Sequence, residues 1–125
     1  MMYHIIVVKV KTNRKGDLIM RKRDLTMTLP NGYEMTTTFM RDFDIADVFG
    51  ENAIKDTFKR AFNEWKNNYV YLTELVIALN WHIYKWYEKN ETIARLYNDL
   101  WEQAESYAYE NLKGEELSFF YNVTD

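Results

Sequence analysis

The spacing of apolar residues in this chain changes once, near Asp42, and this change limits the folds that the chain can adopt. Before it, apolar and polar residues alternate over residues 25–39, which is the period of a half-buried strand. After it, apolar residues recur every three or four positions, as in an amphipathic helix. Strands followed by helices predict an α+β fold. At 125 residues the chain suits a single domain over 1–125, with a sheet in 1–41 and a helical layer in 42–125.

Three strands are expected at the start of the chain, arranged as an antiparallel meander. The first covers 3–11, where both faces are apolar, and the second covers 18–29. The third covers 33–39, where the alternation resumes. Pro-Asn-Gly at 30–32 favours a tight turn, because proline presets φ and Asn-Gly tolerates left-handed geometry. The last two strands are therefore expected to form a hairpin.

Three main helices are expected to pack on one face of that sheet. Apolar stripes predict them over 51–66, about 70–89 and 91–112. Shorter helical turns are expected at 45–49 and 115–121. The connections between the long helices are short, which favours antiparallel neighbours.

Most catalytic classes lack their usual residues in this sequence. The chain has no Cys, which excludes thiolate catalysis, disulfides and Cys-ligated zinc. It has two Ser and neither a nucleophile elbow nor a phosphate-binding glycine loop. We therefore expect a protein that is not an enzyme and that uses no cofactor.

The histidines and clustered aspartates receive structural interpretations. His4 and His82 have no second histidine at metal-ligand spacing, and His82 is expected at a helix surface or boundary. Asp42, Asp44 and Asp47 lack the pattern of a calcium loop. Asp44 and Asp47 are expected to cap a helix N-terminus and to interact favourably with its dipole, so no metal site is predicted.

Neither a signal peptide nor a membrane span is expected. The apolar run at 5–8 is too short for a signal peptide, and the longest uncharged apolar stretch, 75–84, is about half of a membrane span. A soluble, cytoplasmic protein is the expectation.

Charge and aromatic residues are distributed unevenly. Residues 1–41 hold eight Lys or Arg and three Asp or Glu, a net charge of +5, whereas residues 42–125 hold eight and sixteen, a net charge of −8. The chain also has 4 Trp, 10 Tyr and 7 Phe. An acidic surface rich in Tyr and Trp is typical of an interface for a basic partner.

The first candidate site is a set of helical aromatic residues that lie outside the apolar stripes. They are Tyr69, Tyr71, Trp81, Tyr84, Trp101 and Tyr109. On an exposed surface they would bind a basic protein. The alternative stays open that a helix between the sheet and another helix needs two apolar faces, which would bury Trp81 and Tyr84.

Two further candidates use the basic N-terminal part. The first is nucleic-acid binding, in which basic side chains contact phosphates. The residues are Lys9, Lys11, Arg14, Arg21, Lys22 and Arg23. These residues could equally protect a sheet edge from pairing. The second is a self-associating structural protein, a homo-oligomer in which the +5 part of one copy meets the −8 part of another.

Four stretches of the sequence carry a resemblance to other proteins. They are TMTLPNGYE at 26–34, DIADVFG at 44–50, YLTEL at 71–75 and ENLKGEEL at 110–117. Over residues 24–125 the chain resembles small uncharacterised accessory proteins of phages and conjugative elements of Gram-positive bacteria. The resemblance implies an accessory gene of a mobile element and a host defence nuclease as partner, of the CRISPR or restriction type. It supplies no catalytic residue.

Overall fold

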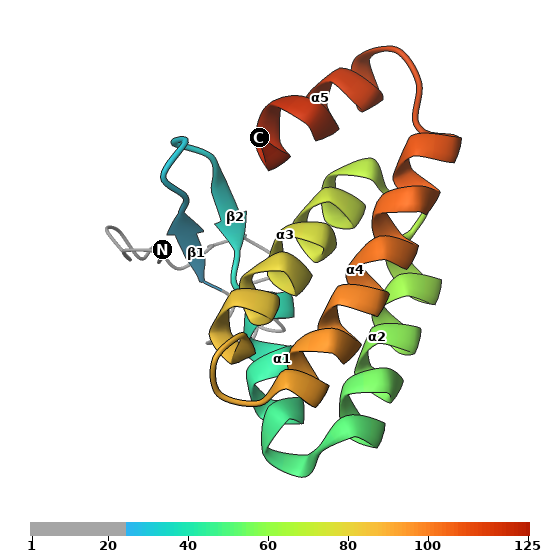
Figure 1. The fold of residues 1–125 in the computed structure, drawn as a ribbon. Coiled ribbons are helices and arrows are strands. Elements are labelled where there is room, and N and C mark those ends of the chain that lie inside the picture. Colours follow the sequence, from blue (N-terminus) through green and yellow to red (C-terminus); the bar gives the residue numbers. More distant parts are fainter. Residues whose placement is uncertain (1–24) are drawn as a thin grey trace, which may run out of the picture.

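The computed structural model describes residues 25–125, which are mostly helical (Figure 1). In chain order the elements are β1 (Thr26–Thr28), β2 (Glu34–Thr36), α1 (Thr38–Phe49), α2 (Glu51–Trp65), α3 (Tyr69–Trp86), α4 (Glu91–Asn111) and α5 (Glu115–Thr124). Over these residues there are five helices and one two-stranded antiparallel sheet. None of these helices has the length and apolar character needed to span a bilayer.

The predicted α+β fold of a three-stranded meander with helices on one face is therefore wrong. The predicted strand over 3–11 lies outside the described residues. The predicted third strand ends at Thr36, and a helix begins at Thr38. The buried residues here are Phe39, Met40, Phe43 and Ala46, and spacings of one, three and three place them on one side of a helix but on both faces of a strand.

The predicted hairpin is confirmed, with shorter strands. β1 and β2 pair antiparallel with Met27 opposite Met35, and both side chains are buried. The turn uses Gly32 at φ 91°, a left-handed conformation that glycine adopts without strain. The Asn31 side-chain amide donates a 2.8 Å hydrogen bond to the Val123 carbonyl, so the turn is held against the end of α5.

Helix α3 is the central element of the fold. Its residues 72–79 are all buried, because α1, α2, α4 and α5 each contact it. Figure 1 shows α4 beside α3, with α5 crossing near one end of the pair and the hairpin next to α3. A helical segment covered on all sides must be apolar around its whole circumference, and residues 72–79 meet this requirement with the exceptions of Thr73 and Glu74.

The three long helices agree with their predicted ranges to within three residues at each end. Asparagine caps explain two of the starts. The Asn68 side chain accepts hydrogen bonds from the backbone of Val70 and Tyr71, and that of Asn90 accepts one from Ile93. The expected turn at 115–121 is a ten-residue helix, α5.

Glu74 fastens the hairpin to α3 from a buried position. Its carboxylate accepts hydrogen bonds from the Tyr33 hydroxyl at 2.8 Å and from the Thr36 hydroxyl at 3.0 Å. Burial and the bond to this carboxylate raise the pKa of Tyr33 well above its usual range. The hairpin is therefore tied to the central helix by charge-assisted hydrogen bonds as well as by apolar packing.

Candidate functional site

The structure separates the six aromatic residues predicted as a binding site. Tyr84 and Tyr109 are exposed, at 63% and 46%. The other four are half-buried and pack against the core: Tyr69, Tyr71, Trp81 and Trp101. Tyr71 makes edge contacts with Phe39 and Trp65, and Tyr69 contacts Phe119, so these two side chains serve packing.

Tyr84, Trp101 and Tyr109 belong to one surface, which we call the α3–α4 face. It consists of Ile77, Asn80 and Tyr84 on α3 with Tyr87 at its C-cap, and of Asn98, Trp101, Glu105 and Tyr109 on α4. Spacings of three and four place each set on one side of its helix. The two helices lie side by side (Figure 1), and residues of both stripes line common hollows, so the stripes border the same seam. Tyr84 lines neither hollow and belongs to this face by its spacing from Asn80 and Tyr87.

An acidic cleft of about 460 Å³ lies at one end of this face, bounded by α3, α4, α5 and the hairpin turn. Three aromatic rings, of Trp101, Tyr109 and Tyr121, and two carboxylates, of Glu105 and Asp125, line it. Its other lining residues are Leu29, Pro30, Asn31, Val76, Ile77, Asn80, Val123 and Thr124. Within the described part of the chain, no Lys or Arg lines the cleft.

Two lining groups, Glu105 and Tyr109, have raised pKa values, mainly because they are partly buried. Burial raises the pKa of Glu105, and the neighbouring carboxylate of Glu102 raises it further, against an opposing hydrogen bond from Tyr109. Burial also raises the pKa of Tyr109, together with the charge of Glu105 and the nearby Tyr121. The ionised forms of Glu105 and Tyr109 are therefore disfavoured in the cleft, and a bound cation would stabilise them.

A second hollow of about 620 Å³ lies at the other end of the α3–α4 face. Tyr87 and Asn98 contribute to it from the two stripes. Its charged residues have both signs, and Arg95 forms an ion pair with Glu91. The acidic cleft therefore differs from this hollow in having charge of one sign.

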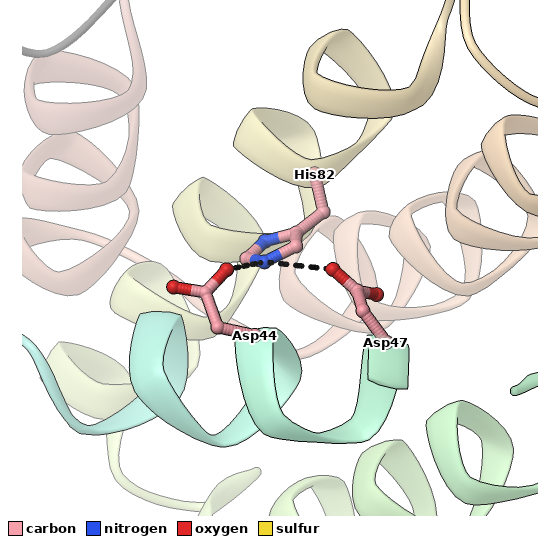
Figure 2. A group of neighbouring side chains, drawn as sticks. All are labelled: Asp44, Asp47 and His82. Carbon is pink, nitrogen blue, oxygen red and sulfur yellow. Dashed lines mark hydrogen bonds and ion pairs between the residues drawn. The ribbon is translucent and has the colours of Figure 1, made fainter. Parts of the chain in front are cut away.

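A buried charge cluster joins α1 to α3 on another side of the molecule, and Figure 2 shows three of its side chains. His82 is fully buried, with Nδ1 2.9 Å from the Ala78 carbonyl and Nε2 2.9 Å from an Asp44 oxygen. A second carboxylate, that of Asp47, lies 3.8 Å from the same Nε2. Both ring nitrogens face oxygen acceptors, so the arrangement is satisfied when each carries a hydrogen.

Asp47 is the centre of this cluster, with its side chain 5% exposed. It accepts hydrogen bonds from Lys85 Nζ at 2.7 Å, from Trp86 Nε1 at 3.0 Å and from the Tyr97 hydroxyl. Lys85 also bonds Asp44 at 2.9 Å. Burial alone would raise the pKa of Asp44, but the hydrogen bonds from His82 and Lys85 outweigh it and lower the pKa.

Asp44, Asp47 and His82 bring three potential metal ligands together. One ligand atom each from Asp44, Asp47 and His82 lies within 4.8 Å of the others, a spacing that a metal ion could bridge. However, the Lys85 ammonium already contacts both carboxylates and would repel a metal ion between them. His82 Nε2 also has no lone pair to offer while it donates to Asp44. We therefore interpret the cluster as an internal ion-pair network that holds α1 on α3.

Two predictions about this cluster are wrong. Asp44 and Asp47 do not cap a helix N-terminus, because α1 begins at Thr38 and places both in its second half. His82 is not at a helix surface, because α1 and α4 cover it. The sequence did contain a signal of this cluster. Asp44 and Asp47 are three residues apart, as are His82 and Lys85, so each pair lies on one side of its helix.

The six basic residues of the alternative nucleic-acid site, Lys9 to Arg23, lie outside the described residues. Comparison with known proteins finds no match to a protein-family model, a curated protein or a solved structure.

Proposed function

We propose that this chain is a non-enzymatic binding protein that docks its α3–α4 face on a basic surface of another protein. The observation that supports the proposal is the acidic cleft. It combines three aromatic rings with two carboxylates and, over residues 25–125, has no basic residue in its lining. Tyr and Trp side chains provide large contact areas at little cost in side-chain entropy, and they are common anchors of interfaces.

The charge distribution supports a basic partner. Residues 42–125 carry a net charge of −8, and all of them lie in the described part of the chain. Complementary charges accelerate the encounter of two proteins, whereas buried aromatic anchors slow their dissociation. The association rate should therefore fall as salt increases, and the dissociation rate should depend on the rings.

The nucleic-acid-binding surface of a nuclease is basic and fits this description. The resemblance to accessory proteins of phages and conjugative elements favours a host defence nuclease as the partner. The protein would then act in the cytoplasm as a counter-defence inhibitor of the anti-CRISPR or anti-restriction type, by covering the surface that binds DNA or RNA.

The test is binding kinetics with a nuclease captured from host lysate and then purified. Tyr84→Ala should increase the dissociation rate at least tenfold. Phe49→Ala is the matched control, since Phe49 is also exposed (76%) but lies on α1, outside the α3–α4 face. An association rate that does not change between low and high salt would contradict the proposal, as would equal effects of the two variants.

The basic segment 9–23 supports nucleic-acid binding as a second candidate function. A gel-shift assay with DNA and RNA at low and moderate salt separates the two candidates. Salt-sensitive binding would favour the second, and no binding at low salt would remove it. Light scattering on the same preparation tests self-association.

A further inference from the structure

The acidic cleft is built for a more specific ligand than a basic surface in general. We propose that it receives one arginine side chain of the partner protein, with the guanidinium group against the aromatic rings and bonded to Glu105. This inference rests on the proposed function and adds the chemistry of the contact. Its ligand is a side chain and not a free metabolite.

The cleft is large enough to admit a side chain of a partner protein. A volume of about 460 Å³ lies within the range of small-ligand sites, roughly 300–1,000 Å³. Tyr109 makes ring contacts with both Phe120 and Tyr121, at 5.6 and 5.7 Å between centroids. These contacts hold the wall formed by α4 and α5 in place, so an entering group meets preformed rings.

The charges of the cleft select a cation. Glu105 and Asp125 would repel a phosphate or a carboxylate of a ligand. A purely apolar side chain would remove water from the two carboxylates without giving them a partner, which is costly. A cation would satisfy the carboxylates and would also be attracted to the faces of Trp101 and the tyrosines.

Arginine fits these groups better than lysine does. A guanidinium is planar, presents five donors in a fixed geometry and stacks on aromatic rings, so it can use a ring and a carboxylate together. An ammonium is a compact, strongly hydrated charge with no face to stack. We therefore expect the cleft to discriminate between the two side chains.

The experiment uses the full chain labelled with ¹⁵N and the capped peptides acetyl-Gly-Arg-Gly-amide and acetyl-Gly-Lys-Gly-amide. The readout is the NMR signal of the Trp101 indole N–H, assigned with Trp101→Phe. The arginine peptide should shift this signal in a saturable way, with an affinity at least fivefold higher than that of the lysine peptide. Glu105→Gln should weaken the binding about tenfold.

Glu110→Gln is the matched control, because it removes the same charge from an exposed position of α4 that does not line the cleft. It should leave the affinity unchanged. No shift at Trp101, equal shifts by both peptides or equal effects of the two glutamine variants would each overturn the inference. A shift that grows with protein concentration alone would also overturn it, since a second copy would then occupy the cleft.

These outcomes are separable from those of the proposed function. If partner binding depends on Tyr84 but not on Glu105, the docking face stands and the arginine contact is refuted. If the arginine peptide binds at Trp101 but Tyr84→Ala leaves partner binding unchanged, the cleft is specific for arginine and the wider docking face is refuted.

Discussion

Replacing Asp47 with asparagine tests whether the buried charge cluster holds α1 on the rest of the molecule. The side chain keeps its shape but loses its charge and one of its two oxygen acceptors. In the wild-type protein the carboxylate accepts from Lys85, Trp86 and Tyr97. The remaining oxygen of asparagine can accept from the donors that bonded one oxygen of the original carboxylate. Its amide hydrogens would then face the donors that bonded the other oxygen.

The expected loss of stability follows from those contacts. Up to two hydrogen bonds to a charged group are lost, each worth about 1.5–3 kcal/mol. Lys85 keeps its bond to Asp44 at 2.9 Å and has a side chain that is 31% exposed, so its charge is not stranded in the interior. This favours the lower end of the range, about 3 kcal/mol in the free energy of unfolding, or about 10 °C in Tm for a domain of this size.

Urea unfolding at pH 7, followed by the helical circular-dichroism signal, measures this loss. Asp44→Asn is the matched control: the Asp44 side chain is 52% exposed, and we expect a cost of about 1 kcal/mol or less. The double variant Asp47→Asn with Lys85→Met should cost less than the sum of the single variants. Equal costs for the two asparagine variants, or additivity in the double variant, would refute the reasoning.

Four further predictions concern single charged side chains and pH. Glu74→Gln should destabilise the protein by about 2 kcal/mol and should increase hydrogen exchange in the hairpin, at Met35, more than in α4. The pKa of Asp44 is lowered from 3.8, so its contribution is present above pH 3.8 and should disappear as the pH falls through the lowered pKa. The pKa of Lys85 is raised from 10.5, because its bonds to Asp47 and Asp44 outweigh the effect of burial. Its contribution to stability should therefore be present below pH 10.5 and disappear above its raised pKa. Unfolding curves across pH test the predictions for Asp44 and Lys85. The pKa of Glu105 is raised from 4.5, so Glu105→Gln should increase stability at pH 7 by up to about 0.5 kcal/mol, a gain that should vanish below pH 4.5.

The helices that could be predicted from the sequence are those whose signals are local. α2, α3 and α4 each have an apolar stripe, and Asn68 and Asn90 cap two of them with side-chain hydrogen bonds. These features depend only on neighbouring residues, so they are visible without knowledge of the fold. The turn at 30–32 was predictable for the same reason.

α1 was not predictable in this way, because the residues at its start fit two periods. The alternation of β2 continues through Thr37 to Phe39, whereas Phe39, Phe43 and Ala46 fit a helix. Packing on the central helix decides between them, since it buries the helical stripe. The charge cluster was missed as a consequence, because its aspartates face His82 only once α1 is known to be a helix.

The exposure of the aromatic residues depended on an element that was expected to be no more than a turn. α5 lies against α3 and α4, and its Phe120 and Tyr121 contact Tyr109. Without α5, Trp101 and Tyr109 would lie on an open helical surface instead of in the wall of a cleft. Sequence periodicity describes one helix at a time and therefore could not show this cleft.

The charge cluster between α1 and α3 and the acidic cleft should respond separately to mutation, because the carboxylates of the cluster are paired with a cation and, in the part of the chain that the structure describes, those of the cleft are not. The carboxylates of the cluster are paired with Lys85 and bonded to His82, Trp86 and Tyr97, so they contribute to stability and their acceptor oxygens are already engaged. Glu105 lines a cleft that, within residues 25–125, has no basic group, so its charge costs stability and is available for a ligand. Asp47→Asn should therefore lower Tm without changing the affinity of the folded protein for the arginine peptide. Glu105→Gln should weaken the affinity for the arginine peptide without lowering Tm. If Tm and affinity fell together in both variants, the separation of the two regions would be contradicted.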